Sequence, residues 1–150
     1  MQKQQGKVRI RITAGVCIFA ALLLLVLPLQ WVFAAIIAAV FHELCHVGAV
    51  YLCGGKIRSL TLGYGGAAME IDPMPCGREL ICALAGPIGG LGTLLLARWI
   101  PRIAVCAGVQ SLYNLLPVYP LDGGRALRCG AALLCPKLGE QFCAILERCC

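Results

Sequence analysis

Apolar residues gather in four long runs, which are separated by short segments rich in glycine, proline and charged residues. The runs cover about residues 12–29, 31–53, 78–97 and 103–116. A helix of about 20 apolar residues is long enough to cross a bilayer core of about 30 Å. The pattern therefore predicts an all-α polytopic membrane protein with about four transmembrane helices, arranged as a single domain over residues 1–150.

The fourth run is shorter than the others. A helix over 103–116 would reach only about 21 Å, which is less than the thickness of the bilayer core. The segment from Pro117 to Leu121 must then lie at membrane depth. Irregular backbone survives there only where it is buried in protein or lines a cavity, so this segment is expected to lie close to a functional site.

An alternating segment at 57–71 predicts a small membrane-associated β-hairpin. Leu60, Leu62 and Tyr64 lie on one side of its first strand. An exposed strand edge could hold an unwound substrate segment by strand addition, which makes these three residues candidates for substrate binding. A hairpin that only covers the helices fits the pattern equally well.

The composition supports a membrane protein, because 60% of the residues are hydrophobic, 13% are charged and the mean hydropathy is +0.85. Average globular chains carry about a quarter charged residues. Too few charges remain here to cover a surface that faces water. The same numbers exclude disordered chains and extended nucleic-acid binding, so no nucleic-acid partner is expected.

The net charge of +6 reflects membrane topology. Only Arg98 and Arg102 of the 13 Lys and Arg residues fall in the predicted outer loops. Because positive residues favour the cytoplasmic side, both termini are predicted to be cytoplasmic, including segment 123–150 with a short surface helix. The first run also resembles a signal peptide. A second run begins at Trp31 without a convincing cleavage site between them, which favours a retained span.

The 11 cysteines are odd in number and include no CxxC pair. Reduced thiols are therefore expected, rather than a disulfide framework or a cysteine zinc site. Acylation of Cys149 and Cys150 stays an alternative, because cysteines next to a membrane are common acceptors.

The second run contains an HExxH motif that begins at His42 and ends at His46, and these are the two histidines of the chain. On a helix, residues four apart share one face, so both imidazoles can reach a single zinc ion while Glu43 acts as general base. Ionisable residues inside an apolar span are functional candidates by default. A polar cluster that only holds helices together is the alternative.

A catalytic zinc ion needs a third protein ligand and an open fourth position. No third histidine exists, so a carboxylate must serve. Asp122 follows the irregular segment after the fourth run, on the side where the second run ends, and can reach the depth of His42 and His46. As an aspartate before two glycines, it also fits a helix cap or a turn.

The HExxH motif and the segment Asn114–Arg125 (NLLPVYPLDGGR) together resemble the site-2 protease family of intramembrane zinc metalloproteases. The similarity covers about residues 31–125 and is greatest to the short bacterial branch that includes the stage IV sporulation FB protease. The resemblance implies zinc bound by His42, His46 and Asp122, with Glu43 as the catalytic acid and base. It also implies that Asn114 contacts substrate or stabilises the oxyanion.

The same resemblance places the segment before the aspartate beside the active site, which makes Pro117 and Pro120 candidates for substrate binding. The segment Ala85–Gly90 (AGPIGG) is similar to the family's central AGP segment, but this chain has Gly90 where many members carry asparagine. Gly86 and Gly90 form a small-xxx-small pair, which favours close helix packing over a catalytic role.

We therefore expect a zinc protease that hydrolyses membrane-tethered proteins within or near their transmembrane segments. The resemblance implies an integral protein of a bacterial cytoplasmic membrane, with the active site toward the cytoplasm and a role such as sporulation. A membrane regulatory partner or a homo-oligomer would supply control. The alternative function is a non-proteolytic zinc-binding membrane protein: a sensor, a transporter or an inactive relative that binds a partner.

Overall fold

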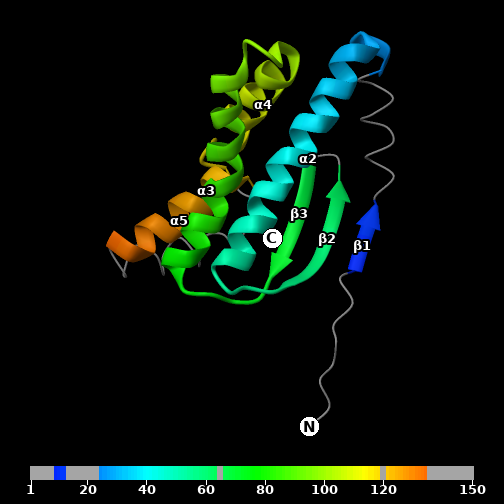
Figure 1. The fold of residues 1–150 in the computed structure, drawn as a ribbon. Helices are drawn as coiled ribbons and strands as arrows, with labels where there is room; N and C mark the ends of the chain where they lie inside the picture. The colour runs from blue at the N-terminus through cyan, green and yellow to red at the C-terminus, as the bar shows by residue number, and fades with distance from the viewer. Residues whose placement is uncertain (1–8, 13–23, 64–65, 119–120, 135–150) are drawn as a thin grey trace.

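The computed structural model describes residues 9–12, 24–63, 66–118 and 121–134 (Figure 1). The elements follow in the order β1 (Arg9–Ile12), α2 (Leu29–Leu52), β2 (Ile57–Gly63), β3 (Gly66–Ile71), α3 (Cys76–Gly92), the 3₁₀ helix η1 (Thr93–Leu96), α4 (Pro101–Asn114) and α5 (Asp122–Leu134). The described part of the chain is mostly helical with one small sheet. This confirms the predicted class at that level.

Two of the described helices are long and apolar enough to cross a membrane. α2 has 24 residues, or about 36 Å, and begins after Pro28. It ends before Gly54, which has a φ of 73° that favours glycine. α3 and η1 together give the second, a helix of 21 residues over Cys76–Leu96. The ends of both helices lie within two residues of the ends predicted for the second and third runs, which is the usual uncertainty of a helix boundary.

α4 is a helix of 14 residues that begins at Pro101, two residues before its predicted start. Proline is well suited to this first helical position, because its missing N–H has no intrahelical partner there. The helix ends at Asn114, so a short helix does follow the predicted fourth run, but it is not one of the two described helices that are long and apolar enough to cross a membrane. Most of the predicted first span lies outside the described residues. Its first residue, Ile12, instead ends strand β1.

The sheet has three strands in the order β1-β2-β3. β2 and β3 are antiparallel and form the predicted hairpin, whereas β1 pairs with β2 in parallel, with Ile10 opposite Leu60. The third strand, β1, was not predicted from the sequence. Residues 9–12 read RIRI, a period-two pattern typical of a strand, whereas the charge pattern alone assigns their arginines to the cytoplasmic N-terminus.

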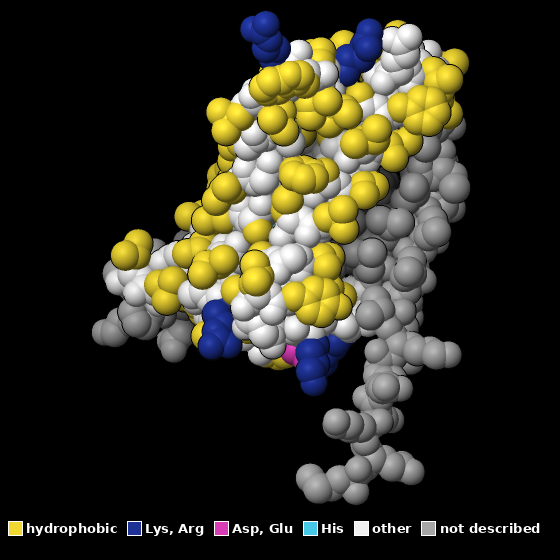
Figure 2. Space-filling model, in the orientation of Figure 1, with side chains coloured by type: hydrophobic (Ala, Val, Ile, Leu, Met, Phe, Trp, Pro, Cys, Tyr) yellow, Lys and Arg dark blue, Asp and Glu magenta, His cyan; other side chains and the backbone are white. Residues whose placement is uncertain are grey.

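Small residues fill the seams between the helices. The buried residues include Ala34, Ala38, Ala83, Ala104 and Ala107, each no more than 4% exposed. Large apolar side chains lie outside, and they cover much of the surface in Figure 2. This inside-out arrangement is typical of helices packed in lipid, where close backbone approach replaces a hydrophobic driving force between helices.

α5 packs against α3 and carries the chain away from the end of α4. Gly123 makes the turn between α4 and α5 possible, because a Cβ there would overlap the backbone of Leu115 and lie 2.5 Å from the carbonyl oxygen of Leu116. This helix begins earlier than the surface helix expected in the tail. That expectation rests on an apolar patch at 131–135, most of which lies in α5, and on an apolar stripe at Phe142, Ile145 and Leu146, which lies outside the described residues.

Candidate metal centre

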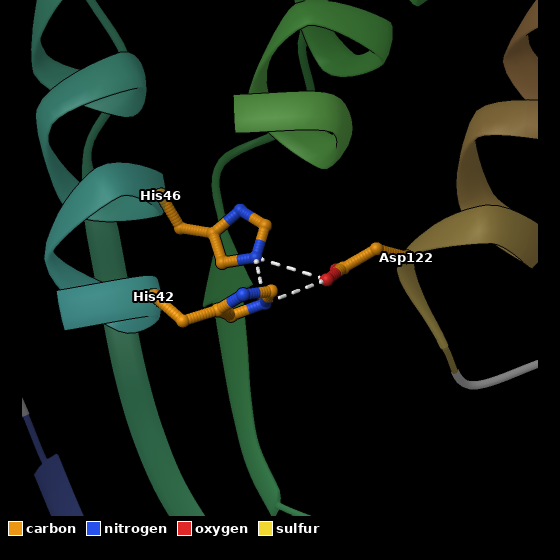
Figure 3. A group of neighbouring side chains, drawn as sticks. All are labelled: His42, His46 and Asp122. Atoms are coloured by element: carbon orange, nitrogen blue, oxygen red, sulfur yellow. Dashed lines mark hydrogen bonds and ion pairs between the residues drawn. The ribbon is translucent and has the colours of Figure 1, made fainter. Parts of the chain in front are cut away.

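The two histidines of the HExxH motif lie on the inner face of α2. His42 is 2% exposed and His46 is 9% exposed, and Ala38, one turn earlier, belongs to the same buried face. Their rings meet edge to face, with centroids 4.8 Å apart. Figure 3 shows both rings pointing away from α2 toward the start of α5. The spacing of four residues thus places both imidazoles on one side, as the sequence predicts.

Asp122 approaches the histidines from the first turn of α5 (Figure 3). Its Oδ2 atom lies 3.1 Å from Nε2 of His42 and 3.0 Å from Nε2 of His46, and the two Nε2 atoms are 3.2 Å apart. The Asp122 side chain is 14% exposed. Asp122 therefore begins a helix and also faces both histidines, so the two alternatives left open by the sequence are compatible.

These separations fit a shared metal ion. Ligand atoms bound to zinc at about 2.0–2.2 Å in a tetrahedral arrangement lie about 3.3 Å from one another. The candidate ligand atoms of His42, His46 and Asp122 all fall within 4.8 Å of one another. The three residues therefore converge on one point with a spacing that a small divalent cation requires.

Hydrogen bonding independently supports a cation at this point. The Nδ1–H of His46 donates to the carbonyl oxygen of Cys82 at 2.7 Å, so in the neutral ring, the form that binds a metal, Nε2 carries the lone pair. That lone pair faces the Asp122 carboxylate and Nε2 of His42. One proton cannot satisfy all three atoms at once, whereas a metal ion can. The Cys82 carbonyl also holds the orientation of the His46 ring, as hydrogen-bond partners behind metal-binding histidines commonly do.

The Asp122 carboxylate stays ionised. Burial raises its pKa, but hydrogen bonds and charge interactions with His42 and His46 outweigh this effect and bring the pKa from 3.8 to about 2. An anionic oxygen is the form in which a carboxylate binds a metal.

Gly86 on α3 lies directly against the two histidines. A Cβ at this position would lie 2.7 Å from Nε2 of His42 and closer still to Nε2 of His46. One turn later, a Cβ at Gly90 would collide with the Ser111 hydroxyl of α4. The structure thus supports the packing role predicted for both glycines, with Gly86 packing on the site itself.

The two predicted catalytic residues also lie close to the three candidate ligands. Glu43 is half-buried and interacts electrostatically with His42, His46 and Asp122. Asn114, the last residue of α4, has its Nδ2 atom 3.3 Å from Nε2 of His42. Two helices and one helix end therefore bring five candidate residues together from three separate parts of the sequence.

The predicted substrate-binding residues lie elsewhere or outside the described chain. Leu60 and Leu62 belong to β2, which is the central strand, so the described open edges belong to β1 and β3. Pro117 is exposed between α4 and α5. Tyr64 and Pro120 lie outside the described residues. Strand addition at β2 itself is therefore blocked on both sides.

Comparisons with known proteins agree with this fold and identify a zinc metalloprotease as a relative. No known family model matches the chain. The chain is 33% identical over 118 residues to zinc metalloprotease MJ0392 of Methanocaldococcus jannaschii, an alignment that covers 69% of this chain and 34% of that protein. A solved structure, the site-2 protease from Methanocaldococcus jannaschii, matches with a TM-score of 0.66 at 22% identity, covering 88% of this chain and 70% of the other.

Fold and site therefore define a site-2-protease-like helical protein with a buried His-His-Asp metal site. The chain is a homologue of the zinc metalloprotease MJ0392, and it spans about a third of the length of that relative.

Proposed function

We propose that this protein is an intramembrane zinc metalloprotease of the site-2 protease family. The observation that carries the proposal is the convergence of His42, His46 and Asp122 within 4.8 Å, at the HExxH motif of a helix able to cross a membrane. Two imidazole nitrogens and one carboxylate oxygen form a common ligand set for catalytic zinc. The similarity to a zinc metalloprotease supports the same metal.

The protein's own groups have distinct tasks in this proposal. When bound, zinc would supply Lewis acidity that polarises a carbonyl and lowers the pKa of a water. The Glu43 carboxylate takes the proton of the attacking water and returns it to the leaving amine. Asn114 directs its amide N–H groups into the space beside His42, where they can donate to the developing oxyanion.

The proposed substrate is a membrane-tethered protein whose transmembrane segment unwinds locally before cleavage. The depth of the site supports a substrate cut within or near its transmembrane segment. His46 lies about 9 Å and His42 about 15 Å along α2 from the end of that helix. α4 ends beside the site after only 14 residues, which leaves the site close to the end where α2 and α3 connect to the sheet. An open edge of β1 or β3 is a suitable place to hold an extended substrate segment.

We further propose that this end of the protein faces the cytoplasm. Lys56, Arg58 and Arg78 lie in the segments that join α2, the sheet and α3, and the positive-inside rule favours the cytoplasm for them. Within the family, the Asn114–Arg125 motif supports the short bacterial branch that contains the stage IV sporulation FB protease. A membrane-tethered transcription-factor precursor is a substrate suited to that branch.

The test compares wild type with Glu43→Gln after reconstitution into vesicles. The probes are single-span proteins whose spans carry a Gly-Pro pair, and mass spectrometry detects cleavage products. We expect both proteins to bind one zinc ion and only wild type to cleave. Cleavage by the variant would overturn the role of Glu43. A zinc-loaded wild type that cleaves none of the probes would favour a non-proteolytic zinc-binding protein.

A further inference from the structure

A partly buried cluster of charges joins α3 to α5 outside the metal site. Glu79 of α3 forms an ion pair with Arg128 of α5, and its Oε1 atom lies 3.8 Å from Nη2 of Arg125. The side chains of Glu79, Arg125 and Arg128 are 17%, 23% and 33% exposed. Solvent screens such pairs less than it screens pairs on an open surface.

This cluster lies on the same helix as one of the candidate metal ligands. Arg125 follows Asp122 by three residues and so lies one turn further on the neighbouring part of the same face, whereas Arg128 follows another turn later and lies about 120° around the helix from Asp122. They lie about 4.5 Å and about 9 Å along the helix from Asp122. A shift of α5 at the arginines therefore moves the carboxylate as well.

The apolar contacts of α5 are limited. Of its 13 residues, only Gly123 and Cys129 are buried. The thiol of Cys129 also lies close enough to interact with Glu79, and burial raises its pKa to about 11. The Glu79 carboxylate is thus the shared partner of several α5 side chains, and it draws this helix onto α3.

The opposite end of the same α3 segment holds the other side of the site. Cys82, three residues after Glu79, accepts the hydrogen bond from His46, and Gly86 packs against both histidines. α3 therefore contacts the histidines through one turn and holds α5 through the preceding turn. This arrangement fixes the distance between the Asp122 carboxylate and the two imidazoles.

We infer that Glu79 is a positioning residue for the metal site, which holds α5 against α3 so that Asp122 reaches the ion. The inference rests on the proposed function, since it takes Asp122 as a ligand. Glu79 contacts neither the histidines nor Asp122 directly in any described interaction. It acts through α5.

The experiment measures zinc affinity of the full chain in detergent by competition with a chelator. Glu79→Gln should bind zinc about tenfold more weakly than wild type, which is the scale typical of outer partners of metal ligands. Glu79→Asp keeps the charge on a shorter side chain and should give a smaller loss. The matched control is Glu70→Gln, because Glu70 is exposed on β3 and accepts a hydrogen bond from Ser59 there.

A double-mutant comparison separates positioning from a general loss of stability. In an Asp122→Ala background, Glu79→Gln should cause no further loss of zinc affinity, because the ligand that it positions is gone. Cobalt substitution gives a second readout. The visible absorption of the cobalt form should change in Glu79→Gln toward that of Asp122→Ala, and stay as in wild type for Glu70→Gln.

Wild-type zinc affinity in Glu79→Gln would overturn the inference while leaving the proposed function intact. An equal further loss in the Asp122→Ala background would also overturn it, since Glu79 would then act on overall stability. If Asp122→Ala itself binds zinc like wild type, the ligand set is wrong, and both the proposed function and this inference fail.

Discussion

Gly86 of α3 allows a direct test of how tightly the metal site is packed. Its Cα faces the two histidines, and an added methyl group would lie 2.7 Å from Nε2 of His42 and 2.7 Å from Cε1 of His46. These separations are well below ordinary van der Waals contact. The rings can move only by leaving the positions in which their nitrogens meet Asp122.

The expected magnitude follows from this overlap. Adding a methyl group to a packed interior costs about 1–3 kcal/mol. If the strain is felt mainly when the rings hold the ion, Gly86→Ala should weaken zinc binding by about fivefold to about 150-fold. Helix propensity alone would favour alanine over glycine by about 1 kcal/mol. A loss of affinity would therefore reflect the contact with the histidines.

The assay is zinc binding by chelator competition, together with thermal unfolding of the metal-free protein. The matched control is Gly77→Ala, which lies in the same helix with nothing within 4 Å of the added Cβ. Its zinc affinity should equal that of wild type. Equal affinities for Gly86→Ala and Gly77→Ala would refute the close packing of α3 on the histidines.

Three further predictions concern the rest of the site. Asn114→Ala should lower the rate of peptide cleavage by about 10²–10³-fold at unchanged zinc content, as expected for loss of an oxyanion donor, and an unchanged rate would exclude that role. Gly90→Ala should lower the free energy of unfolding by about 1–3 kcal/mol, measured by thermal unfolding, because the added Cβ meets the Ser111 hydroxyl. Adding Ser111→Gly should recover part of this loss. If it recovers nothing, the strain does not come from this contact. The pKa of Asp122 is lowered to about 2, so the ionised carboxylate stabilises the metal-free protein fully above about pH 4, and this stabilisation is lost as the pH falls through 2. Asp122→Ala should remove this part of the pH dependence of unfolding. An unchanged pH profile would contradict the lowered pKa.

The sequence predicts the long helices and the histidine pair well, for physical reasons. α2 and α3 are long apolar runs bounded by proline or glycine, and such local signals survive in almost any tertiary setting. The HExxH spacing is equally local, since one helix carries His42, Glu43 and His46. Asp122 required one further assumption, namely that the short fourth helix returns the chain to the depth of the histidines.

Features that depend on distant partners were harder to predict. The parallel pairing of β1 with β2 joins segments that are far apart in sequence, and the alternating pattern of β1 covers only four residues, which is too short to identify its partner strand. The hydrogen bond from His46 to Cys82 uses a backbone carbonyl, which leaves no mark on residue type. The ion pairs of Glu79 likewise required the packing of α5 on α3 to become visible.

His42 and Asp122 are 80 positions apart in the sequence, so a metal ion bound to both would also have a structural effect. A cation bound to both would cross-link the long second helix to the last described one, closing a large loop of chain in much the way that a disulfide does.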